Sequence, residues 1–213
     1  MIAASQFDVN RFAVAAQSIV EAGRFLYGQG WSPATSSNYS ARIDERHIAI
    51  TVSGRHKGQL RTDDVMVVDT DGRAVQSQCR SSAETLLHTV VYQRLPEVGA
   101  VLHTHSVKAT VLSRLLPAGD PLVLSGYELQ KAFPGCDTHE STLTVPVFDN
   151  TQDMDQLSAD TRRWLADNPQ QPGYLIRGHG LYTWGETMAD CLRHVEAFEF
   201  LFECELETMR VSR

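Results

Sequence analysis

Apolar side chains recur at helical spacing in three long segments of this chain. The spacing predicts helices over about 8–29, 82–94 and 186–209, the last being the most regular of the three. Glycines at 28 and 30 end the first pattern, and Pro96 ends the second, because proline cannot continue a helix. We therefore expect three long helices.

Shorter apolar runs between these segments follow strand patterns. Runs at 39–43 and 47–51 flank a short polar gap, and runs at 65–68 and 74–75 flank Asp71–Gly72, so each pair predicts a hairpin. Because hairpins precede helices rather than alternate with them, we expect an α/β fold with a central, mainly antiparallel sheet flanked by helical layers. We expect one domain over residues 1–213. Further helices are expected at about 106–115, 128–133 and 153–167, and further strands near 101–105, 122–124, 143–148, 173–177 and 181–184.

Composition excludes several classes of protein. The net charge of −7 leaves no basic stripe of the kind that nucleic-acid binding requires. No apolar stretch approaches the length of a membrane span, and no segment resembles a secretory leader, so we expect a cytoplasmic protein. The 4 cysteines form no CxxC pair and are too few for a disulfide framework, so reduced thiols are expected.

A pair of histidines in the strand at 101–105 is the strongest chemical signal. Side chains two residues apart on a strand share a face, so His103 and His105 would lie side by side. A lone histidine more often caps a strand, but two adjacent imidazoles on an apolar strand have no obvious packing role. His179, between two glycines after another strand, supplies a third candidate. Three histidines would hold Zn²⁺ and leave one coordination position open.

Three polar loops accompany this candidate metal site. Thr35–Asn38 and Thr51–Gly54, the latter followed by His56 and Lys57, supply hydroxyls, an amide and a cation, as an anion site requires. Ser81–Glu84 opens the helix expected at 82–94, where free N–H groups favour a phosphate. The same four residues also fit a capping box, and that interpretation is favoured from this motif alone.

The order of these motifs resembles class II aldolases of the fuculose-phosphate aldolase type over about residues 8–209. The resemblance implies a homotetramer that binds a small sugar phosphate, with one Zn²⁺ per subunit held by His103, His105 and His179. The motifs that carry it are Ser37–Asn38, Ser53–Gly54, Ser82 with Glu84, His103–His105 and Arg177–Gly180. The family's phosphate contacts would fall on Ser37, Asn38, Ser53, Gly54 and Ser82, and at the level of the subgroup on Lys57.

The most specific match within this family is to its sugar-phosphate dehydratases of methionine salvage. It is carried by the segments 99–106, 126–131, 145–151 and 179–185. The match implies zinc-dependent dehydration of 5-methylthioribulose 1-phosphate to 5-methylthio-2,3-dioxopentyl phosphate. It also implies that Glu128 is the acid/base residue, with Glu84 as the competing candidate because it matches the metal-proximal glutamate of the aldolases.

Three alternative functions follow from the same family. A retro-aldol enzyme would use the same metal site, but the residues after Cys204 lack the tyrosine that class II aldolases often supply. A pentulose-phosphate 4-epimerase usually has aspartate where this chain has Glu84. A non-catalytic scaffold would have little reason to keep an open metal site with two glutamates, which makes it the weakest alternative.

Overall fold

A seven-stranded sheet forms the centre of the computed structural model, which describes residues 7–75 and 77–212. The strand order is β3-β2-β1-β4-β9-β8-β7, and every neighbouring pair is antiparallel except β7 and β8. The central strand β4 is buried along its whole length between β1 and β9. The strands are β1 (Asn38–Arg42), β2 (His47–Thr51), β3 (Val65–Asp69), β4 (Ala100–Thr104), β7 (Val147–Phe148), β8 (Gly173–Ile176) and β9 (Gly180–Gly185).

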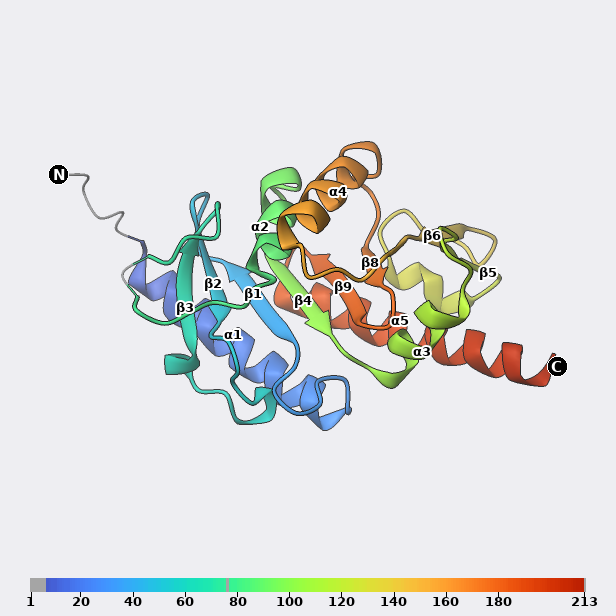
Figure 1. Ribbon diagram of the computed structural model, residues 1–213, viewed down its shortest axis with the longest axis horizontal. Coiled ribbons are helices and arrows are strands. Elements are labelled where there is room, and N and C mark those ends of the chain that lie inside the picture. The colour runs from blue at the N-terminus through green and yellow to red at the C-terminus, as the bar shows by residue number, and fades with distance from the viewer. Residues whose placement is uncertain (1–6, 76, 213) are drawn as a thin grey trace.

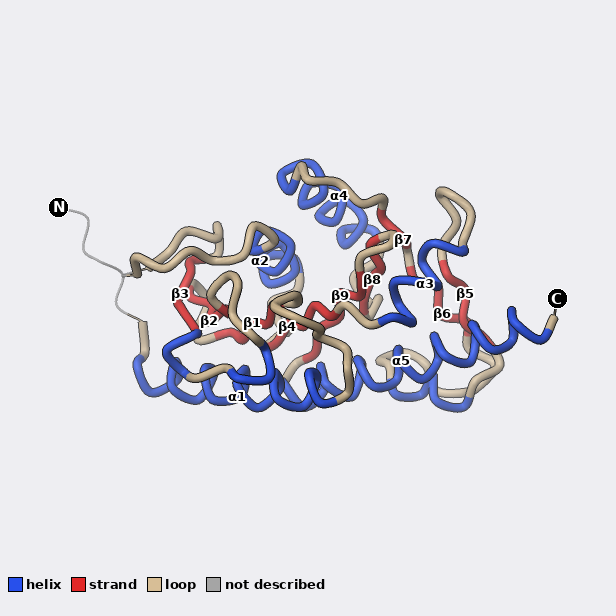
Figure 2. Tube along the Cα trace, turned by 60° about the horizontal axis from the view of Figure 1, so that its bottom comes forward, coloured by secondary structure: helices blue, strands red, loops and turns tan. Residues whose placement is uncertain are grey.

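Helices cover both faces of this sheet. Figure 2 shows α1 (Val9–Gly28) and α5 (Met188–Val211) along one face, and α2 (Thr85–Arg94) with α4 (Met154–Asp167) along the other. Each layer encloses its own hydrophobic core, because alternate side chains of β2 and β3 point to opposite faces. Asp8 caps α1 by accepting from the backbone N–H groups of Asn10 and Arg11.

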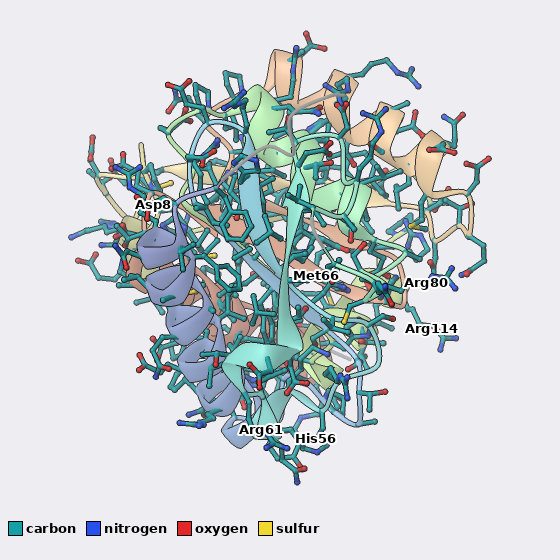
Figure 3. The ribbon with its side chains drawn as sticks, turned by 90° about the vertical axis from the view of Figure 1, so that its left-hand side faces the viewer. Asp8, His56, Arg61, Met66, Arg80 and Arg114 are labelled. Atoms are coloured by element: carbon teal, nitrogen blue, oxygen red, sulfur yellow. The ribbon has the colours of Figure 1, made fainter. Side chains whose placement is uncertain are left out.

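A smaller unit extends the fold beyond β8. It contains α3 (Val107–Leu115), the two-stranded sheet β5 (Leu122–Ser125) and β6 (Thr142–Val145), and the 3-10 helix η3 (Glu128–Ala132). Its apolar side chains pack on the C-terminal half of α5, which continues past the main sheet (Figure 1). Two further 3-10 turns, η1 (Lys57–Gln59) and η2 (Thr62–Asp64), connect β2 to β3. Figure 3 views the opposite edge of the molecule, with Met66 on β3 and Asp8 at the start of α1.

The structure confirms the α/β fold with a mainly antiparallel sheet and corrects four local predictions. The second hairpin is reduced to a single bridge between Val68 and Ala74. The strand expected at 143–148 is divided at Pro146, whose ring nitrogen cannot donate to a ladder. The helix expected at 128–133 is a 3-10 helix. The capping box of Ser81 and Glu84 does not form, because the side chain of Glu84 makes no cap hydrogen bond.

Among the described residues, no helix is both long and apolar enough to cross a membrane.

Candidate functional site

Three histidines meet where β4 ends and β9 begins. His103 is the fourth residue of β4, His105 directly follows that strand, and His179 lies in the turn between β8 and β9. One nitrogen of each ring lies within 4.8 Å of the others. Gly180 permits this approach, because a Cβ atom at that position would lie 2.0 Å from the carbonyl oxygen of Thr104. The three histidines predicted from sequence to bind a metal are therefore brought together within one chain.

The spacing of the three rings fits a zinc ion. The Nε2 atoms of His103 and His179 are 3.2 Å apart, and two nitrogens bound to one tetrahedral zinc are expected about 3.3 Å apart. The Nδ1 atom of His103 donates to the carbonyl oxygen of Leu181 at 2.9 Å, so its Nε2 atom carries the free lone pair. Burial lowers the pKa of His103 well below its ordinary value and that of His105 to about 4, which keeps both rings neutral and able to bind a cation.

The carboxylate of Glu84 lies against these histidines. Its Oε1 atom is 3.1 Å from Nε2 of His179, and its Oε2 atom is 3.4 Å from Nε2 of His103. Oε2 also accepts hydrogen bonds from the amide of Asn38 at 2.7 Å and from the hydroxyl of Tyr182 at 3.0 Å. Two neutral donors therefore hold Oε2 in place beside His103, while Oε1 faces His179.

Hydrogen bonding keeps the Glu84 carboxyl ionised. Burial opposes its ionisation, yet hydrogen bonds with His179 and Asn38 hold the pKa of this carboxyl well below its usual range. The group is therefore a fixed negative charge at neutral pH. A cation bound by the histidines would have this charge beside it.

A stack of aromatic rings on the sheet packs against one of the histidines. The ring of Tyr182 lies 4.0 Å from that of His103 at an interplanar angle of 13°, and Tyr174 stacks on the other face of Tyr182 at 5.0 Å. Antiparallel pairing of β4 and β9 sets this contact, because His103 and Tyr182 are direct partners in the ladder. Tyr182 thus orients one histidine by stacking and Glu84 by hydrogen bonding.

A cavity of about 250 Å³ opens beside the histidines. It brings together every residue that the sequence proposed for phosphate binding, and Glu84 and His105 line it as well. The turns at Ser37 and Gly54 have positive φ angles of 71° and 75°, so both loops leave the strands abruptly. The proposed phosphate residues that line the cavity are Ser37, Asn38, Ser53, Gly54, Lys57 and Ser82.

Lys57 places a buried positive charge in the wall of this cavity. Its side chain is 1% exposed, and its ammonium group donates to the carbonyl oxygens of Thr35 and Arg55 at 3.2 and 2.7 Å. Within the part of the chain that the structure describes, no carboxylate pairs with it. Burial lowers its pKa to about 8. An ammonium has three donors, so one remains for an anion in the cavity.

Glu128 lies elsewhere in this chain. It begins η3, where its carboxylate pairs with Lys131 and lies 4.0 Å from a ring nitrogen of His139. Its side chain is 71% exposed, and it borders a shallow depression formed with Leu129 and Phe200. Glu128 does not line the cavity that holds Glu84.

Two site residues had no assigned role in the sequence. Tyr182 falls within a recognised motif, but its contact with His103 depends on the register between β4 and β9. His88 follows Glu84 by four residues, a spacing that places both on one side of a helix, and it bonds Asn38 and Ser40. That spacing was the one feature of the sequence that could have linked His88 to the site.

Comparisons with known proteins agree with this geometry. The model of the class II aldolase and adducin N-terminal domain matches residues 17–206. The methylthioribulose-1-phosphate dehydratase of Marinobacter nauticus is 79% identical over 97% of this chain and 100% of its own length. That of Hahella chejuensis is 66% identical over 97% of this chain and 99% of its own length.

Solved structures show the same fold at lower identity. An L-fuculose 1-phosphate aldolase superposes with a TM-score of 0.78 at 20% identity, covering 94% of this chain and 88% of that one. The L-fuculose-1-phosphate aldolase of Thermus thermophilus gives 0.73 at 23% identity, covering 95% and 97%. The chain therefore belongs to the class II aldolase and adducin family and, within it, to the methylthioribulose-1-phosphate dehydratases, which are hydro-lyases.

Proposed function

We propose that this protein dehydrates 5-methylthioribulose 1-phosphate to 5-methylthio-2,3-dioxopentyl phosphate in methionine salvage, with one Zn²⁺ per subunit bound by His103, His105 and His179. The observation that carries the proposal is the meeting of three imidazoles, the carboxylate of Glu84 and a hydroxyl-lined cavity with a buried lysine at one end of β4. The names of the two close relatives supply the substrate.

The cavity is proposed to hold the phosphate on C1 of the substrate. Ser37, Ser53 and Ser82 offer hydroxyl groups, and Lys57 offers a charge-assisted hydrogen bond. The N-terminus of α2 lies beside Ser82, so the dipole of this helix favours a negative charge at the same place. The chemistry of the cavity therefore suits a phosphate monoester next to the histidines. Asn38 and Gly54 are the remaining phosphate contacts of the proposal, although the amide of Asn38 already bonds Glu84.

Dehydration of this substrate moves two protons. The C3–H bond and the C4–O bond break, water leaves, and the resulting enol takes a proton at C4 to give the 2,3-diketone. Bound Zn²⁺ would polarise the C2 carbonyl and so make the C3 proton more acidic. The protein must supply a base for C3 and an acid for the departing hydroxyl.

We assign the proton transfer to Glu128 and keep Glu84 as the competing residue. The Oε2 atom of Glu84 already accepts hydrogen bonds from Asn38 and Tyr182, which leaves only Oε1 for a proton transfer. Glu128 carries an exposed carboxylate but lies outside the cavity of its own chain. The assignment therefore requires Glu128 to reach the site of a neighbouring subunit.

Exposed apolar side chains support such a neighbour. Val107, Val111 and Leu115 recur every four residues on α3 and are 75%, 40% and 48% exposed. This helix starts two residues after His105, so a subunit packed on it would lie beside the site. Leu129 and Phe200, next to Glu128, are 39% and 51% exposed. We propose a homotetramer in which these surfaces are covered.

Mass spectrometry of the reaction product tests the proposal. The purified protein, with its metal content measured, is incubated with 5-methylthioribulose 1-phosphate. Loss of one water to give the diketone phosphate is the expected result. Release of dihydroxyacetone phosphate would identify a retro-aldol enzyme instead, and an unchanged substrate mass would point to the epimerase or scaffold alternatives.

A further inference from the structure

A chain of hydrogen bonds leads away from Glu84 into the core between α2 and the sheet. The Oδ1 atom of Asn38 bonds Nε2 of His88, whose Nδ1 atom lies 2.7 Å from the hydroxyl oxygen of Ser40. That oxygen lies 2.9 Å from the hydroxyl of Tyr92. His88 and Ser40 are completely buried, and Tyr92 is 2% exposed.

The direction of every bond in this chain follows from the amide of Asn38. Its NH₂ group donates to Oε2 of Glu84, so its carbonyl oxygen faces His88. His88 must then carry its proton on Nε2, and its Nδ1 lone pair accepts from Ser40. Ser40 in turn accepts from Tyr92. Burial lowers the pKa of His88 to about 3, which agrees with a neutral ring.

We propose that His88 is a positioning residue that acts through Asn38 on Glu84. An amide can rotate by 180° and present oxygen instead of nitrogen, which would put a carbonyl against the carboxylate. The N–H at Nε2 of His88 favours one of these two orientations, because only the carbonyl oxygen of Asn38 can accept it. The donor to Oε2 of Glu84 is thereby fixed, and Oε1 keeps its direction toward His179.

This inference rests on the proposed function, and kinetics of five variants test it. H88L removes the donor to Asn38, whereas H88Q keeps an N–H near the place of Nε2. We expect H88L to lower kcat about 10- to 100-fold with little change in KM, as for other residues that orient groups at a metal. H88Q should recover most of that loss. N38A and the double variant N38A/H88L complete the cycle, and the double variant should be no slower than N38A alone.

H194L is the matched control. His194 is also buried, at 3% exposure, and its Nδ1 atom donates to the carbonyl oxygen of Trp184 away from the metal site. It should lose stability as H88L does and keep kcat. The proposal would be overturned if the fall in kcat of N38A/H88L equalled the product of the falls in the two single variants. It would also be overturned if H88Q folds but is as slow as H88L. Equal losses of kcat in H194L and H88L would do the same, since burial alone would then explain them.

A spectrum separates this inference from the proposed function. Cobalt(II) bound by the three histidines in place of zinc has visible absorption bands that respond to the groups around it. H88L should shift these bands as N38A does, the double variant should shift them no further, and H88Q should restore the wild-type bands. A wild-type protein that turns over no substrate would refute the proposed function alone. Unchanged bands in H88L would refute the role of His88 alone.

Discussion

Mixing two inactive variants would reveal whether Glu128 serves a neighbouring subunit. H103A removes a proposed metal ligand, and E128A removes the proposed proton carrier. Within one chain these residues lie at different places, because His103 is buried in the group of three histidines and Glu128 is exposed on η3. If each site combines the histidines of one subunit with Glu128 of another, a mixed oligomer contains some complete sites.

The expected recovery follows from counting subunits. In a random 1:1 mixture, half of the sites have intact histidines, and half of those face a neighbour with intact Glu128. About one quarter of the sites are therefore complete, and kcat per subunit should reach about one quarter of the wild-type value. The two variants are co-expressed with different tags, hybrids are purified through both tags, and turnover is measured after metal loading.

A second mixture controls this experiment. H103A and E84Q alter residues that lie together in one chain, with carboxylate and ring nitrogen 3.4 Å apart. Hybrids of these two variants contain no complete site, so they should show no recovery. If hybrids of H103A and E128A also show only the summed activity of their parents, the trans arrangement of Glu128 is wrong.

Four further predictions concern single residues. E84Q keeps an acceptor for Asn38 and Tyr182 but removes the negative charge beside the proposed metal ligands. Turnover should therefore fall at least 10²-fold while metal content, measured by mass spectrometry, stays constant. K57M should raise KM about 10- to 100-fold in steady-state kinetics, because a charge-assisted bond to phosphate contributes roughly 1.5–3 kcal/mol. Burial lowers the pKa of His88 to about 3, so the folded protein loses stability as pH falls below 6.5. In the wild type, the free energy of unfolding measured with urea should therefore be lower at pH 5.0 than at pH 7.5. In H88L, this decrease should be smaller by about 2 kcal/mol. Burial raises the pKa of Glu199 to about 7, so ionisation of this carboxyl destabilises the folded protein increasingly as pH rises above 4.5. In urea unfolding, E199Q should therefore stabilise the protein by about 2 to 3 kcal/mol more at pH 8 than at pH 5.

Local patterns were sufficient for most of the fold. The first helix and the first hairpin form as predicted, because Asp8 supplies a cap and the short polar gap after Ile43 leaves room only for a tight turn. Ser81 and Glu84 satisfy the capping rule in sequence, yet the tertiary structure uses the carboxylate of Glu84 elsewhere. It bonds Asn38 and Tyr182, which are 46 and 98 residues away along the chain.

In the candidate site too, local motifs could be predicted from the sequence and tertiary contacts could not. The histidines and the phosphate loops were found because each is a compact motif. The structure brings the three histidines together and places the phosphate loops around a cavity that His105 also lines. Contacts across strands could not be found in this way. The stacking of Tyr182 on His103 depends on the register of β4 and β9, and the bond between His88 and Asn38 depends on how α2 packs on β1. Such pairings are set by the whole sheet and leave no local signal.

The pairing of β4 with β9 also bears on how the proposed metal would be held. Leu181 orients the ring of His103, and the pairing brings His179 close to it, so bonds of the sheet backbone position the proposed ligands. A metal bound there would add to a site that the sheet arranges, unlike the metal of small zinc-dependent domains that unfold when the ion is removed. A rigid imidazole set binds several first-row ions and favours them in the order of their intrinsic affinities. The ion bound at the proposed site would therefore reflect the supply of metals in the cell as much as the selectivity of the protein.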